Sequence, residues 1–322
     1  MNSKRVLYKG IVSVILVLAV LAAAIVPAVC STENLSPLKD KNILFVGDSI
    51  AAGWRDEAYG GNYTNEGGWS ARIADLYGAE VTNAATAGSP LSTIRESENR
   101  PAIVNQLHLN KDGNFDYIIL QGGFNDAMGT NANPTKETAA KVGEMTDSFE
   151  ATDFDTSTFA GALEDLFFYA KEYFPKAKVG FIINYATPLS TYGGYTAEED
   201  AMREYWNMAK AVCDKWGISY LDLFDGKTAD GKSYSYDILD VNTSNNFPGG
   251  NDNIHLNAAG YDVITPYIAS WIPTTSAVSG GYSLKWENSV PADAIVHLDF
   301  EEQYLYNEAH AFTNNYVYYK NI

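Results

Sequence analysis

The sequence predicts an α/β fold in which helices flank a parallel sheet, because short apolar segments alternate with helical ones along most of the chain. The short segments are rich in β-branched and aromatic residues, which is typical of buried parallel strands. A hydrophobic content of 46% and frequent turn residues also indicate a globular chain. The expected strands cover residues 43–46, 80–83, 117–120, 179–184 and 218–221.

Helical patterns fill the intervals between these strands, and several have recognisable ends. A helix over residues 69–77 should stop at Gly78, since glycine readily adopts the left-handed conformation that ends helices. A helix over residues 159–174 is preceded by Thr158, a candidate cap. Two more helices are expected at residues 196–216, where Thr196 and Glu199 form a capping box, and at residues 258–271.

The carboxyl ends of the strands should gather at one edge of the sheet, because crossover connections between parallel strands are right-handed. Ligands of open α/β sheets bind outside that edge. Four segments follow the ends of predicted strands: Ser49, residues 87–88, residues 122–126 and the segment before His255. We therefore expect these scattered residues to converge on one site.

Three of the converging side chains have the chemistry of a serine esterase. Ser49 follows a strand, and His255 has the carboxylate of Asp252 three residues before it. A serine hydroxyl attacks a carbonyl only when a base accepts its proton, and histidine suits that task because it titrates near neutrality. Two alternatives remain open: Ser49 could cap a helix, and Asp222 could orient the histidine in place of Asp252.

Four separated segments of the chain resemble the SGNH-hydrolase superfamily, also called GDSL-type esterases. They occur in the order of that family and cover residues near 40–272. The resemblance implies a flavodoxin-like three-layer α/β/α fold with a five-stranded parallel sheet, and an enzyme that hydrolyses esters without a cofactor. The four segments are Gly47-Asp48-Ser49, residues 83–88, residues 123–126 and residues 252–261.

The resemblance also implies a role for each residue of the site. Ser49 would be the nucleophile, His255 the general base and then acid, and Asp252 the carboxylate that orients the imidazole. The backbone N–H groups of Ser49 and Gly88 and the side-chain amide of Asn125 would form the oxyanion hole. Asn125 and its neighbour in sequence could instead build an Asx turn. We find no cluster of histidine or cysteine that indicates a metal site, and expect none.

The N-terminus has the layout of a secretory signal peptide. Lys4, Arg5 and Lys9 precede an uncharged apolar run over residues 11–29, which ends among small residues. An uncleaved membrane anchor, or a lipoprotein attached through Cys30, are the alternatives. In each case we expect the protein to be secreted or held at the cell surface, with membrane contact only through this segment if it is not cleaved.

Charge excludes some partners. Loss of residues 1–30 would remove three basic residues and no acidic one, so the net charge would change from −18 to −21. Such a chain should repel nucleic acid and disfavours an acidic polymer as substrate. Cys213 would then be the single cysteine, and we expect it to be a buried inert thiol. The sequence does not indicate an oligomeric state.

Aromatic residues in the loops of the active edge suggest a carbohydrate substrate, since flat rings beside polar groups are suited to sugar stacking. They could equally pack the loops onto the body. Asp48, Phe124 and Tyr192 are the predicted substrate-binding residues, and the expected substrate is an O-acetyl or other short acyl ester, on a small molecule or a polysaccharide. Residues 126–157 are polar and acidic, which argues against the apolar lid of a lipid hydrolase. The loop aromatics are Trp54, Tyr59, Tyr63, Phe124, Tyr185, Tyr192, Tyr195 and Phe247.

Two other functions fit the same residues. A lysophospholipase or thioesterase would use the same triad on a lipid ester, and a surface carbohydrate-binding protein would carry an inactive hydrolase domain. In the latter case the C-terminal tail would be the working module. We expect three parts in the chain: a signal peptide or anchor in residues 1–30, the hydrolase domain in 40–272, and a linker with a β-rich tail in 273–322.

Overall fold

The computed structural model describes most of the residues between Ser36 and Gly281. The expected signal peptide or anchor lies outside the described residues, as does the tail beyond Gly281. Within the described part of the chain, no helix is both long and apolar enough to cross a bilayer. The described ranges are residues 36–60, 65–129, 136–187, 191–192, 195–196, 199–243, 245–248 and 252–281.

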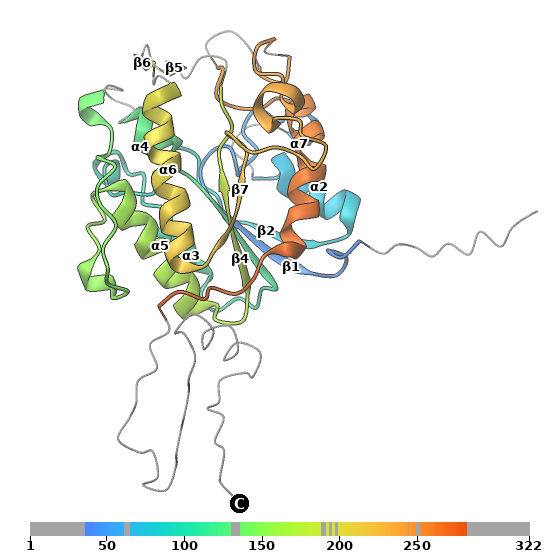
Figure 1. The fold of residues 1–322 in the computed structure, drawn as a ribbon. Helices are drawn as coiled ribbons and strands as arrows, with labels where there is room; N and C mark the ends of the chain where they lie inside the picture. The colour runs from blue at the N-terminus through green and yellow to red at the C-terminus, as the bar shows by residue number, and fades with distance from the viewer. Residues whose placement is uncertain are drawn as a thin grey trace, which may run out of the picture.

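A five-stranded, fully parallel sheet forms the centre of the domain, in the order β2-β1-β3-β4-β7. The helices α2 and α7 cover one face, and α3, α5 and α6 cover the other (Figure 1). This arrangement confirms the predicted three-layer α/β/α fold and all five predicted strands. The strands are β1 (Asn42–Val46), β2 (Glu80–Asn83), β3 (Tyr117–Gln121), β4 (Lys178–Ile183) and β7 (Ser219–Asp222).

The helices begin and end largely where local signals placed them. Gly78 ends α2 with φ 69°, and Thr158 Oγ1 caps α5 by accepting the N–H of Gly161 at 3.2 Å. The predicted capping box at Thr196 includes residues that the structure does not describe. The helices are α2 (Gly68–Tyr77), α3 (Val104–Asn110), α4 (Phe124–Met128), α5 (Phe159–Tyr173), α6 (Glu199–Trp216) and α7 (Ala258–Trp271), and a short antiparallel pair joins β5 (Thr191–Tyr192) to β6 (Tyr195–Thr196).

The central strand β1 is rigidly buried, which matters because it leads directly to Ser49. Its residues from Ile43 to Val46 are at most 1% exposed. Burial of each such large apolar side chain contributes about 1.5–3 kcal/mol relative to exposure. The strand is therefore a fixed base for the turn that follows it.

The beginning of the predicted linker packs against the domain. Ser276 forms an antiparallel bridge with Val179 of β4, and Val278 is buried. The N–H of Gly280 donates to the carbonyl oxygen of Trp216 at 2.8 Å. Residues 273–281 thus extend the hydrolase domain, while the expected β-rich tail lies outside the described residues.

Candidate active site

Buried amides hold the turn that follows β1. The N–H and carbonyl groups of Gly47 each bond to the side-chain amide of Gln106, both at 2.8 Å. Gln121 Oε1 accepts the N–H of Asp48 at 3.2 Å. A Cβ at Gly47 would lie 2.7 Å from Gln121 Oε1, so only glycine fits between the strand and this amide. The position of Ser49 is therefore set by buried contacts on both sides of its turn.

Ser49, His255 and Asp252 form a continuous hydrogen-bonded chain. The Oγ of Ser49 lies 2.8 Å from Nε2 of His255, and Nδ1 of His255 lies 2.8 Å from Oδ1 of Asp252. The second carboxylate oxygen accepts Nε–H of Arg55 at 2.7 Å. The imidazole is 7% exposed, and its centroid lies 5.9 Å from that of the Trp54 ring. The structure thus brings together three residues that are up to 206 positions apart in sequence.

The contacts of Asp252 keep its carboxylate ionised. Burial alone would raise the pKa of Asp252, but the hydrogen bond and charge of His255 and the bond from Arg55 outweigh it and bring the pKa below its ordinary value. Asp222, the alternative orienting carboxylate, is occupied elsewhere. It lies 2.6 Å from Lys210 Nζ and caps the turn after β7 by accepting the N–H of Phe224 at 2.9 Å.

Asn125 and Gly88 approach the same end of the sheet. The Asn125 side chain directs its Nδ2 toward Asp48 Oδ2 at 3.4 Å and the carbonyl oxygen of Ser89 at 3.2 Å, and its Oδ1 accepts Nη1–H of Arg95 at 2.9 Å. Gly88 has φ 81°, a left-handed conformation that strains any residue with a side chain. Both proposed oxyanion-hole loops are therefore fixed by the local backbone and by polar contacts.

Asp126 anchors the loop that carries Gly88. Its buried carboxylate accepts the N–H of Leu91 at 2.8 Å, the N–H of Ser92 at 2.9 Å and the Ser92 hydroxyl at 2.6 Å. Burial raises the pKa of Asp126, although these hydrogen bonds oppose it. This carboxylate ties the loop after β2 to the start of α4, so it does more than the local Asx turn considered as its alternative role.

A sequence model of the GDSL-like lipase/acylhydrolase family matches residues 45–263. The chain belongs to this family. Its members hydrolyse ester bonds, and this protein is therefore an ester-bond hydrolase. No curated protein sequence matches the chain significantly.

Solved structures resemble the chain in fold. A Lactobacillus plantarum protein is 20% identical, with coverage of 73% of this chain and 98% of that protein and a TM-score of 0.50. An aryl esterase from M. smegmatis is 16% identical, with coverage of 73% and 100% and a TM-score of 0.48. A carbohydrate acetylesterase from Sinorhizobium meliloti is 18% identical, with coverage of 73% and 99% and a TM-score of 0.47.

Two of the three predicted substrate-binding residues of this GDSL-family hydrolase are buried. Asp48 is fully buried, which raises its pKa to about 6, and its Oδ1 accepts the N–H of Ile50 at 2.9 Å. Phe124 is 4% exposed and packs edge-on against Trp206, with 6.0 Å between ring centroids. Their burial leaves little of either side chain exposed to a substrate; Asp48 bonds within the turn at Ser49, and Phe124 packs against α6. The side chain of Tyr192 lies outside the described residues.

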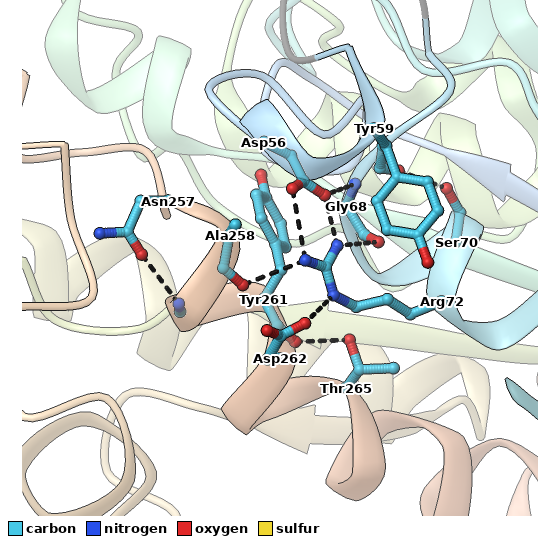
Figure 2. A network of polar contacts seen from close by, with 12 residues as sticks. Asp56, Tyr59, Gly68, Ser70, Arg72, Asn257, Ala258, Tyr261, Asp262 and Thr265 are labelled. Carbon is cyan, nitrogen blue, oxygen red and sulfur yellow. Dashed lines mark hydrogen bonds and ion pairs between the residues drawn. The ribbon is translucent and has the colours of Figure 1, made fainter. Parts of the chain in front are cut away.

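Sequence reasoning missed a buried arginine that joins the two halves of the site (Figure 2). Arg72 of α2 forms an ion pair with Asp56, which lies in the turn after Ser49, and donates to Asp262 Oδ1 of α7 at 2.6 Å. It also donates to the carbonyl oxygen of Ala258 at 3.0 Å. Because Asp56 follows Ser49 and α7 follows His255, this one side chain holds the two segments together in space.

The helical periodicity of α2 could have indicated that Arg72 is buried. Arg72 lies three positions after Trp69, on the face of α2 that the helical period assigns to the core. A charge on that face requires buried partners, and the structure supplies them from segments 16 and 190 residues away. Tyr261 adds a further tie, since its hydroxyl donates to the carbonyl oxygen of Ile50 at 2.9 Å.

Proposed function

We propose that this hydrolase is a serine esterase that removes short acyl groups, such as acetyl, from carbohydrate hydroxyls. The observation that carries the proposal is the hydrogen-bonded chain from Ser49 through His255 to Asp252, with 2.8 Å at each contact. These distances match those that a nucleophile and a general base need for proton transfer.

The chemistry follows from these positions. Ser49 Oγ attacks the ester carbonyl carbon while its proton passes to Nε2 of His255, and a tetrahedral oxyanion forms. His255 then returns that proton to the leaving alcohol, the C–O bond breaks, and an acyl-enzyme remains on Ser49. A water molecule, deprotonated by the same imidazole, releases the acid. Asp252 stabilises the imidazolium in both halves and keeps its Nδ1–H directed away from the serine.

The oxyanion would be bound by three donors: the N–H groups of Ser49 and Gly88 and the side-chain amide of Asn125. The Asn125 amide supports this role because both contacts of its nitrogen, at 3.2 and 3.4 Å, are at the long end of the hydrogen-bond range. A developing negative charge can therefore take over one of its hydrogens through a stronger, charge-assisted bond.

A short acyl ester on a carbohydrate suits the surroundings of the triad. The half-buried ring of Trp54 lies beside His255 and can stack on a sugar. The net charge of −18 opposes anionic polymers. The polar, acidic composition of residues 126–157 differs from that of an apolar lid over a lipid site. Several predicted loop aromatics serve packing instead; these are Phe124, Tyr185 and Phe247, each at most 4% exposed.

Replacement of Ser49 tests the catalytic part of the proposal. We expect Ser49→Ala to lower turnover of p-nitrophenyl acetate by at least about 1000-fold, since a triad without its nucleophile retains little catalysis. Ser270→Ala, on an exposed position of α7, is the matched control and should retain full activity. Unchanged turnover in a folded Ser49→Ala protein would exclude this mechanism.

A panel of esters separates the substrate classes. Acetylated sugars should be cleaved with higher kcat/KM than esters of longer acyl chains. Activity that rises with chain length would instead identify a lysophospholipase or thioesterase. Binding to polysaccharide without labelling of Ser49 by a fluorophosphonate would identify an inactive, carbohydrate-binding protein.

We further propose that residues 1–30 export the protein, so that the hydrolase domain acts outside the cell and the residues after Gly281 form an appendage to it. The basic start, the apolar run and the small residues near Cys30 support this. N-terminal sequencing of protein recovered from the culture medium should begin shortly after Ala28 or Cys30. Recovery of the whole chain from the cytoplasm alone would contradict export.

A further inference from the structure

Arg95 is a buried cation next to the proposed oxyanion hole. Its side chain is 1% exposed, and its guanidinium contacts oxygens of Asn125, Gly88 and Gly129. Nη1 donates to Asn125 Oδ1 at 2.9 Å and lies 3.3 Å from the carbonyl oxygen of Gly88. Nε donates to the carbonyl oxygen of Gly129 at 2.7 Å. One guanidinium therefore contacts both loops that supply the hole, as well as the end of α4.

The contact from Arg95 favours one orientation of the Asn125 amide, the same one that the acceptors Asp48 Oδ2 and Ser89 O favour at its nitrogen. An amide has an acceptor oxygen and a donor nitrogen of nearly the same size, and a half-turn of the side chain exchanges them. In one orientation the nitrogen faces the reacting carbonyl and stabilises the oxyanion. In the other the oxygen faces it and repels the same charge. Arg95 has donors only, so the amide must direct Oδ1 toward it and Nδ2 away from it.

The charge of Arg95 acts in the same direction. The carboxylate of Glu98 lies 3.9 Å from Arg95 Nε. A cation bonded to the oxygen of an amide withdraws electron density from it and makes the amide N–H a stronger donor. The interaction strengthens as negative charge develops on the substrate, which is the condition for acceleration of a reaction.

We propose that Arg95 is a positioning residue of the oxyanion hole: it fixes the amide of Asn125 with its N–H groups toward the reacting carbonyl and polarises them. The inference rests on the proposed function, because it assigns Asn125 to that hole. In this role Arg95 acts on the reacting carbonyl only through Asn125.

The test is a double-mutant cycle between Arg95→Met and Asn125→Ala, with p-nitrophenyl acetate as substrate. Loss of one oxyanion donor typically costs about 100- to 1000-fold in kcat, so loss of its positioning residue should cost on the order of 10- to 100-fold. KM should change little. In the Asn125→Ala background, Arg95→Met should change kcat by less than about threefold, since the group through which it acts is gone.

Arg100 supplies the matched control. Its Nη1 donates to the carbonyl oxygen of Ala87 at 2.7 Å, so it supports the same loop without a contact to Asn125. Arg100→Met should leave kcat within about threefold of the parent. If thermal melting shows that Arg95→Met does not fold, Arg95→Lys replaces it in the double-mutant cycle. Lysine keeps the charge, but its single ammonium group cannot reach all three oxygens.

Three results would overturn the inference: an unchanged kcat in a folded Arg95 variant, an equal loss in the presence and absence of Asn125, or an equal loss in Arg100→Met. Failure of the proposed function gives a different pattern. In that case Ser49→Ala itself remains active, whereas an inactive Ser49→Ala with an unaffected Arg95 variant contradicts only the role of Arg95.

Discussion

Asp48→Asn should change how the stability of the protein depends on pH. Asp48 is fully buried in the turn before Ser49, and burial is the largest cause of its raised pKa. The hydrogen bonds from Ile50 and Gln121 and the charge of His255 oppose that rise. Asparagine has nearly the same shape and can still accept the N–H of Ile50, but it does not ionise.

The magnitude follows from the two pKa values of Asp48, 3.8 in a free side chain and about 6 in the folded protein. The folded state holds the proton more tightly, so the stabilisation is complete below pH 4 and is lost as pH rises to about 6. A difference of about two pKa units corresponds to roughly 3 kcal/mol. Relative to the parent, the free energy of unfolding of Asp48→Asn should rise by up to about 3 kcal/mol across this window.

Urea denaturation of both proteins at intervals from pH 4 to 7.5 measures this difference. The difference between the two proteins removes the contributions of other titrating groups, because both proteins contain them. One such group is Asp165, whose pKa is also raised by burial to about 6. The new amide beside Asn125 can also change the free energy of unfolding by a constant amount. That amount does not depend on pH, so it does not affect how the difference varies with pH. Parallel stability curves would refute the reasoning, since they would mean that Asp48 binds its proton equally well in the folded and unfolded chains.

Two further substitutions test how the site is held together. Arg72→Met should lower the free energy of unfolding by about 3–5 kcal/mol, because it leaves the buried carboxylate of Asp56 without its cation; a loss below about 1 kcal/mol in urea denaturation would contradict this. Arg55→Gln should lower the free energy of unfolding at pH 7 by less than about 1 kcal/mol, because the bond from Arg55 helps to lower the pKa of Asp252 and the pair is partly exposed. The difference should shrink as pH falls below about 4, where the carboxylate of the unfolded chain becomes protonated; equal stability of the two proteins at pH 7 in urea denaturation would contradict it.

The sheet and the long helices were predictable because their signals are local. The strands are continuous apolar runs, and α2 has a recognisable end at Gly78; the cap of α7 at Asn257 was seen only in the structure. The short helices α3 and α4 were not predicted. Helix α3 has seven residues and no side-chain cap, and α4 has five residues after a glycine with φ 109°. Such elements form because surrounding segments hold them, which no local pattern reports.

The residues of the candidate site also fall into those that the sequence could predict and those that it could not. Ser49, His255 and Asn125 could be predicted because they occur in short motifs at the ends of elements, where their residue types indicate a chemistry. The buried arginines could not be assigned a role, because Arg72 and Arg95 have partners that lie 190 and 30 residues away. The sequence shows that a charge is present but does not show which oxygens surround it.

By itself, the sequence determined a parallel α/β domain and the set of reactive groups that an ester hydrolase needs, since periodicity and residue chemistry are local properties. Only the tertiary structure decided that Asp252 and not Asp222 contacts the imidazole, and that Asp48 and Phe124 are buried. The physical reason is that hydrogen bonding, burial and the resulting pKa shifts depend on distances between segments. Those distances exist only after the chain has packed.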